Sequence, residues 1–162
     1  MSAHPLQSIA MSIAPVDIAV FSKDRRPMLI VDVKNGSVYG TAEAAVGVRS
    51  SLIEHGFLPD IPFFMLATTI QIFLWCGDAE PEAYPNYSAT TNPIFDSYGM
   101  ERGSRERSGY DSALDIVFFW WLSDLMRGAW PLSADSEVGR MLLDSGLHTR
   151  IQDGTADFDV ML

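Results

Sequence analysis

Two aspartates and a lysine in the first quarter of the chain have the side chains that metal-assisted hydrolysis uses. Asp17 and Asp32 belong to two short apolar runs joined by a charged turn that ends in proline. The runs are rich in β-branched and large apolar residues, which favours a β-hairpin. With the turn centred on Asp24 and Arg25, antiparallel pairing places Asp17 opposite Asp32 at about 5 Å. Strand alternation then puts Lys34 on the same face, although a register slip of one residue would separate the three.

Two chemical interpretations of this cluster are open. Converging carboxylates suit a hard divalent cation, because Mg²⁺ prefers oxygen ligands and retains waters for a substrate phosphate. Such an ion lowers the pKa of a bound water, while Lys34 stabilises negative charge in the transition state. In the structural alternative, Lys34 simply neutralises Asp32 in a salt-bridged hairpin. Either way, Asp32 interrupts an apolar strand and needs a cation, a metal or hydrogen bonds nearby.

The composition limits the class of protein. A chain of 162 residues with 48% hydrophobic content predicts one globular domain. The net charge of -10 argues against a broadly basic nucleic-acid surface but leaves a local basic site open. The single Cys76 excludes an internal disulfide, and we expect a buried, inert thiol. The start of the chain does not resemble a secretory signal and no apolar run suits a membrane span, so we expect a cytoplasmic protein with no membrane partner.

The order of elements after the hairpin predicts an α/β fold. Residues 42–55 have the caps of a helix, in which Arg49 and Glu54 are expected to face solvent. In the alternative interpretation, Glu43 or Arg49 belongs to the rim of the site. Residues 63–67 and 70–75 favour sheet, as either one long strand or a tight hairpin. Strand, helix and strand in this order indicate a mixed β-sheet flanked by helices.

Two stretches give weaker signals. Residues 6–13 fit a short helix or an edge strand, without a cap or period that decides between them. Residues 77–109 lack sustained periodicity and predict a long loop. The end of this stretch, residues 101–107, contains three arginines. We interpret them as a solvated surface loop or, alternatively, as a phosphate clamp.

The last third of the chain predicts helices. Residues 110–127 have a helical period, with an apolar face over 114–125 that needs a second surface from the C-terminal segment or another subunit. We therefore expect a homo-oligomer through this helix. A shorter helix is predicted over 133–145. The dipeptide Asp153-Gly154 favours a hairpin turn, so its flanks at 149–152 and 156–160 are expected to form an edge hairpin.

The hairpin, with the helix and strands expected after it, resembles the signature of the PD-(D/E)xK nuclease superfamily. This resemblance covers roughly residues 14–75. It implies the restriction-endonuclease-like fold, in which a mixed β-sheet is flanked by helices. It also implies Mg²⁺ or Mn²⁺ held by Asp17, Asp32 and Val33, and phosphodiester hydrolysis assisted by Lys34.

Two functions follow from the sequence. The first is a metal-dependent nuclease that acts on DNA, with RNA as a further candidate, and uses Asp17, Asp32 and Lys34 as catalytic residues. The second is a catalytically inactive restriction-endonuclease-like module for binding or assembly, which homo-oligomerises through 114–125. The acidic net charge and the lack of a glutamate before Glu43 favour the second. Under both, residues 1–162 form a single nuclease-like domain with a helical C-terminal extension over about 110–146.

Overall fold

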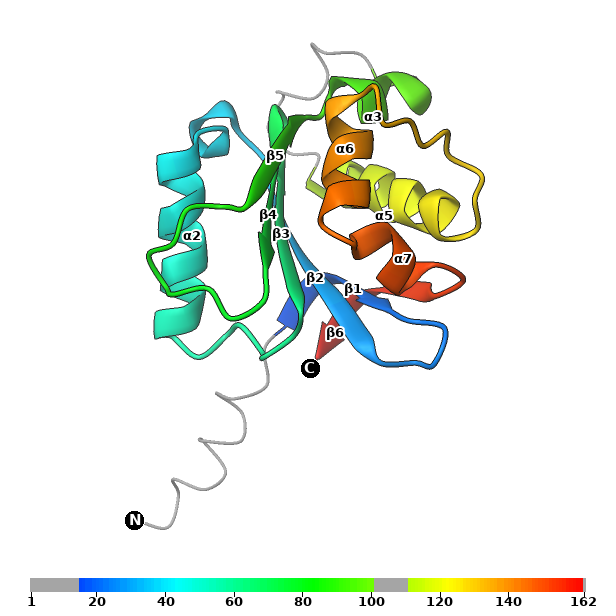
Figure 1. Cartoon of the computed structure of the whole chain (residues 1–162). Helices are drawn as coiled ribbons and strands as arrows, with labels where there is room; N and C mark the ends of the chain where they lie inside the picture. The colour runs from blue at the N-terminus through cyan, green and yellow to red at the C-terminus, as the bar shows by residue number, and fades with distance from the viewer. Residues whose placement is uncertain (1–14, 101–110, 162) are drawn as a thin grey trace.

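In the part of the chain that the structure describes, a six-stranded mixed sheet separates one helix from a group of four (Figure 1). The computed structural model describes residues 15–100 and 111–161, so the segments 6–13 and 101–107 lie outside the described residues. The strands are β1 (Pro15–Phe21), β2 (Pro27–Lys34), β3 (Phe63–Thr68), β4 (Gln71–Cys76), β5 (Tyr87–Thr90) and β6 (Thr155–Met161). The helices are α2 (Ala42–Glu54), α3 (Asn92–Ser97), α5 (Asp111–Met126), α6 (Glu137–Asp144) and α7 (Leu147–Ile151), with a 3₁₀ turn η1 (Ser37–Tyr39).

The predicted hairpin of β1 and β2 is confirmed. The strands pair antiparallel with Ile18 opposite Val31 and Ala19 opposite Ile30. Arg25 in the turn has a φ of 67°, the left-handed conformation that lets the chain reverse tightly. Continued by one residue, this register brings Asp17 opposite Asp32, as the alternation of the sequence predicts.

The segment after the hairpin forms a crossover to a parallel strand. Thr41 caps α2, because its side chain accepts a hydrogen bond from the Ala44 N–H at 3.1 Å. β3 then pairs parallel to β2, and β4 returns antiparallel to β3. The tight-hairpin alternative is therefore the right one for this region. The Thr68 hydroxyl closes the turn, since it donates to the Gln71 carbonyl at 2.7 Å and accepts from the Gln71 N–H at 2.9 Å.

Strand alternation gives the sheet two different faces. α2 covers one face, where it packs on a cluster that includes Ile30, Phe64 and Trp75. The other helices cover the opposite face and enclose the larger core (Figure 1). Asp32 and Lys34 follow Ile30 at intervals of two, so the candidate site lies on the α2 face of the sheet.

The helix at 110–127 is confirmed as α5, and its apolar stripe is buried within the chain. Six of its side chains are at most 4% exposed: Leu114, Val117, Phe118, Trp121, Leu122 and Leu125. The sheet and the C-terminal segment supply the second surface that this stripe needs. Homo-oligomerisation through 114–125 stays a prediction, and it would use Ile116 and Trp120, which are 37% and 50% exposed.

Two predictions about residues 77–160 are wrong, and a third is confirmed with a later start. The stretch 77–109 is not a continuous loop, because it contains β5 and α3, which are too short to produce a visible period. No edge hairpin forms around Asp153, since residues 147–151 are helical and β6 pairs with β1 instead. The Asp153-Gly154 turn is real, with a φ of 61° at Asp153, but it joins a helix to a strand. The helix predicted over 133–145 begins later, at Glu137.

Two further expectations can be compared with the structure. Cys76 is a free thiol at the end of β4 and is half-buried rather than buried. Burial raises the pKa of this thiol, which makes it a weak nucleophile. In the described part of the chain, no helix has both the length and the apolar character needed to cross a membrane.

Candidate functional site

Asp17 is held in place by the strand opposite it. Its Oδ2 accepts a hydrogen bond from the backbone N–H of Val33 at 2.7 Å, just beyond the last paired residues of the two strands. The carboxylate therefore takes the place of a backbone acceptor in the ladder. This contact fixes the first acid beside Asp32 without using the Asp32 side chain.

Asp32 is a poorly compensated acid. Its Oδ2 is buried and has no hydrogen-bond partner among the described residues. Lys34 Nζ lies 3.7 Å from this oxygen, which is longer than the 2.7–2.9 Å of a charge-assisted hydrogen bond. Burial raises the pKa of Asp32 to about 7, and the neighbouring Asp17 adds to the shift while Lys34 opposes it.

The raised pKa of Asp32 argues against the alternative in which the cluster is only a salt bridge that stabilises the hairpin. A salt bridge that served to stabilise the hairpin would hold the pKa of Asp32 below its usual range. Here the pKa is raised, so Lys34 does not offset the burial and the second carboxylate. The three predicted residues are brought together, but they carry more negative charge than the fold neutralises.

The donor set fits a hard divalent cation. Asp17 and Asp32 offer carboxylate oxygens, the ligands that Mg²⁺ and Mn²⁺ prefer. The Val33 side chain packs toward the core on the opposite face, so Val33 could contribute only its backbone carbonyl. Within residues 15–100 and 111–161, no group of three or more His, Cys, Asp or Glu is placed to hold a metal. Waters or substrate oxygens would have to complete the coordination, which is usual for Mg²⁺.

Two adjoining hollows lie between the cluster and α2. The larger one, of about 400 Å³, is lined by Lys34, Tyr39 and the small side chains on one face of α2. The smaller one, of about 20 Å³, lies beside Asp32 and has apolar walls that include Phe57. Leu52 lines both hollows, so we call the two together the α2 cleft. The larger hollow gives a substrate access to Lys34, and the smaller one, next to Asp32, has room for about one water molecule.

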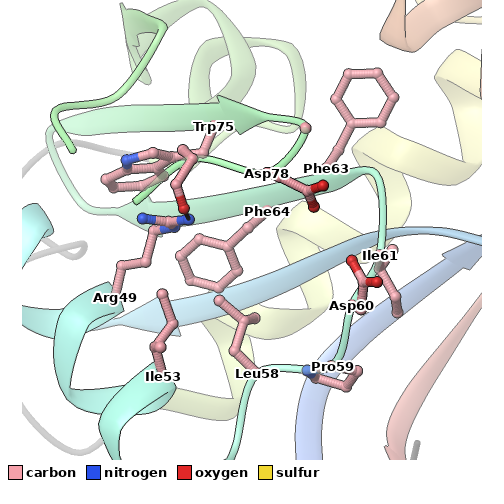
Figure 2. Close-up of a pocket in the computed structure, with 12 residues that line it drawn as sticks. Arg49, Ile53, Leu58, Pro59, Asp60, Ile61, Phe63, Phe64, Trp75 and Asp78 are labelled. Carbon is pink, nitrogen blue, oxygen red and sulfur yellow. Dashed lines mark hydrogen bonds between the residues drawn. The ribbon is translucent and has the colours of Figure 1, made fainter. Parts of the chain in front are cut away.

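The burial of Arg49 contradicts the prediction that this side chain faces solvent. Its side chain is 5% exposed and lies under a loop, where Nη1 and Nη2 donate to the carbonyls of Glu80 and Ala79 at 2.8 and 2.9 Å. The guanidinium also lies over the Trp75 ring at 5.4 Å (Figure 2). Small residues on α2, such as Ala45, let the helix approach the sheet closely enough for this side chain to reach the loop. Burial lowers the pKa of Arg49.

Arg49 also lines a pocket of about 150 Å³ on the α2 face (Figure 2). The carboxylates of Asp60 and Asp78 lie at the edge of this pocket, and Leu58 and Phe64 form apolar walls. The hydrogen bonds of Arg49 are directed to the chain itself. We therefore assign Arg49 to loop anchoring, a role that period and spacing did not reveal.

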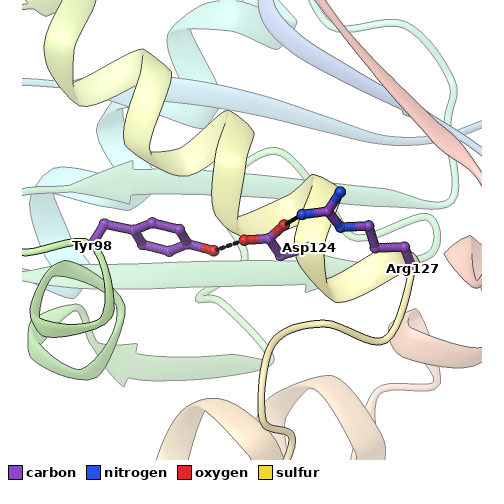
Figure 3. A network of polar contacts seen from close by, with 3 residues as sticks. All are labelled: Tyr98, Asp124 and Arg127. Carbon is purple, nitrogen blue, oxygen red and sulfur yellow. Dashed lines mark hydrogen bonds and ion pairs between the residues drawn. The ribbon is translucent and has the colours of Figure 1, made fainter.

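A second polar network lies on the opposite face of the sheet (Figure 3). The Tyr98 hydroxyl donates to Asp124 Oδ2 at 2.6 Å, and Arg127 forms an ion pair with the same carboxylate. Burial and this hydrogen bond raise the pKa of Tyr98, which keeps the hydroxyl protonated. The network ties the end of α3 to α5 and is structural.

The fold and the cluster together define a class of protein. The described chain is a mixed α/β protein whose sheet holds two carboxylates and a lysine beside an open cleft. Comparison with protein-family models, curated proteins and solved structures finds no significant match. The functional assignment therefore depends on the chemistry of the cluster and its surroundings.

Proposed function

We propose that this protein is a metal-dependent nuclease that hydrolyses phosphodiester bonds in DNA, with Asp17, Asp32 and Lys34 as its catalytic residues. One observation supports the proposal most strongly: Oδ2 of Asp32 is buried next to a second carboxylate and has no hydrogen-bond partner among the described residues, with Lys34 Nζ 3.7 Å away. A fold does not maintain uncompensated charge for its own stability, because burying such a group destabilises it. A divalent cation would neutralise the pair.

Each residue has a separate role in this proposal. Asp17 and Asp32 would hold Mg²⁺ or Mn²⁺, with the Val33 carbonyl as a further ligand. When bound, the ion would supply an acidified water and offset charge on the phosphate. Lys34, which is 38% exposed at the wall of the α2 cleft, stabilises the negative charge that develops on the phosphate oxygens. The Val33 N–H keeps the Asp17 carboxylate oriented toward the site.

The order of elements supports the restriction-endonuclease-like interpretation. A hairpin that bears both acids, a helix after the lysine and then further strands are the features that the resemblance to PD-(D/E)xK nucleases implies, and the first of these strands, β3, pairs parallel to β2. We propose this fold family on the arrangement of β1, β2, α2 and β3. The C-terminal helices are then an addition to that core.

The alternative is a catalytically inactive assembly module of the same fold. The exposure of Ile116 and Trp120 on α5 favours it, because large apolar side chains on one helix offer a surface to a second copy. Light scattering combined with a metal titration separates the two functions. A stable dimer with no affinity for Mg²⁺ or Mn²⁺ supports the assembly module.

The nuclease proposal is tested by incubating plasmid and single-stranded DNA with the protein in Mg²⁺, Mn²⁺ or EDTA. We expect cleavage that needs the metal and is abolished in Asp32→Ala and in Lys34→Ala. Asp60→Ala is the matched control, since it removes an exposed carboxylate at the edge of a different pocket. Cleavage that survives both site substitutions rules out the assignment.

A further inference from the structure

We infer that the α2 cleft accepts a single nucleic-acid strand, gripped through its bases, and not a duplex gripped through its phosphates. This inference rests on the proposed function, since it names the substrate of the same site. It follows from which side chains line the cleft and from where the cations of the described chain lie.

The cleft has very little positive charge. Of the described residues that line its two hollows, Lys34 is the one lysine or arginine. The outer surface of α2 adds the exposed acids Glu43 and Glu54. A protein that holds a DNA duplex commonly neutralises several phosphates with lysine and arginine. The α2 cleft offers one such contact.

The other described cations are placed elsewhere. Lys23, Arg25 and Arg26 lie in the β1–β2 turn, and Lys34 is seven residues beyond that turn's end, or about 23 Å along β2. Arg49 is buried under its loop. The remaining arginines of the described residues lie in or just after helices of the opposite face: Arg127 pairs with Asp124, Arg140 bonds the carbonyls of Ala134 and Asp135, and Arg150 lies over the Phe63 ring.

The α2 cleft is lined by aromatic side chains. Tyr39 lines the larger hollow and Phe57 the smaller one. Phe57 is 38% exposed and is stacked with His55, with ring centroids 6.0 Å apart. Unpaired bases stack on such rings whatever their sequence, whereas the paired bases of a duplex are already stacked on one another. The larger hollow is thus suited to an unpaired base stacked on Tyr39, and the exposed part of Phe57 offers a second ring.

The test is fluorescence anisotropy with the full chain in Ca²⁺, using a labelled oligothymidine of about 16 nucleotides and a duplex of the same length. We expect the oligothymidine to bind at least tenfold more tightly. Its affinity should fall only about threefold between about 50 and 200 mM salt, as one phosphate contact requires. Equal affinity for the duplex, or a loss of about a thousandfold over that range, overturns the inference.

Substitutions in the cleft locate the binding. Tyr39→Ala and Phe57→Ala should each weaken oligothymidine binding about fivefold or more. Phe57→Leu keeps an apolar side chain in the fold and should weaken binding as well. The control is Tyr84→Ala, because Tyr84 is 59% exposed and lines neither hollow. Unchanged binding in all three cleft variants overturns the inference.

Failure of the inference can be told apart from failure of the proposed function. Preferential cleavage of duplex DNA by the wild type, lost in Asp32→Ala, contradicts the single-strand inference and leaves the nuclease intact. Tight, salt-insensitive binding of oligothymidine without cleavage in Mg²⁺ or Mn²⁺ supports the inference and contradicts the nuclease.

Discussion

The Asp17 carboxylate accepts a hydrogen bond from the Val33 N–H at 2.7 Å, across the hairpin and one residue past Asp32. One acid of the pair is therefore fixed by the backbone of the strand that carries the other acid. Asp32, in contrast, has a buried oxygen without a hydrogen-bond partner in the described chain. The two carboxylates are alike in chemistry, but Oδ2 of Asp32 lacks the kind of hydrogen bond that Oδ2 of Asp17 accepts.

Asp17→Ala should destabilise the protein, since it leaves the part-buried Val33 N–H without its acceptor. We expect a loss of about 1–3 kcal/mol in the free energy of unfolding, measured by urea denaturation in EDTA. Asp17→Asn keeps an oxygen that can accept the same bond and should lose less than about 1 kcal/mol. Equal losses in the two variants would show that the hydrogen bond is not the cause.

Asp32→Asn should stabilise the metal-free protein at pH 8. The substitution removes a buried charge beside Asp17 and keeps the volume of the side chain, so we expect a gain on the order of 2–3 kcal/mol. The same variant should not cleave DNA. A loss of stability in Asp32→Asn would instead identify Asp32 as a structural partner of Lys34.

The stability of the metal-free wild type should fall as the pH rises. The folded protein holds the Asp32 proton more tightly than the unfolded chain, because the pKa is raised from 3.8 to about 7. This contribution is complete below pH 4 and is lost as the pH approaches 7. Comparing wild type with Asp32→Asn by denaturation from pH 4 to pH 8 isolates it. A difference between them that does not change with pH contradicts the prediction.

Arg49→Met should loosen the loop that holds Ala79 and Glu80. The change removes two hydrogen bonds from a buried guanidinium and should cost about 1–3 kcal/mol of stability. Hydrogen exchange over residues 77–86 should become faster. Arg140→Met is the matched control, since its contacts with carbonyls are exposed and measure 3.3 and 3.4 Å. An effect of the same size in both variants would contradict the anchoring role.

Patterns among neighbouring residues in the sequence correctly predicted the β1–β2 hairpin and the start of α2. The turn at Asp24 and Arg25 and the alternation of two strands gave the hairpin register, and the cap at Thr41 gave the start of α2. The face-to-face placement of Asp17 and Asp32 followed from the same alternation. These features depend on residues close together in the chain.

Features set by distant contacts were missed. β6 pairs with β1, which lies more than a hundred residues earlier, and nothing in its own sequence identifies that partner. The helical conformation of 147–151 and the strand β5 are stabilised by packing on the rest of the domain rather than by their own periods. The burial of Arg49 depends on a loop thirty residues away. The α2 cleft likewise appears only when α2 is packed on the sheet.

The most direct measurement of the central claim is an anomalous difference map from crystals of this protein soaked in Mn²⁺. We expect one peak within about 2–2.5 Å of carboxylate oxygens from both Asp17 and Asp32, and no peak in crystals of Asp32→Asn. A saturating soak that gives no peak between these two residues, or a peak bound by one of them alone, would contradict a shared catalytic metal.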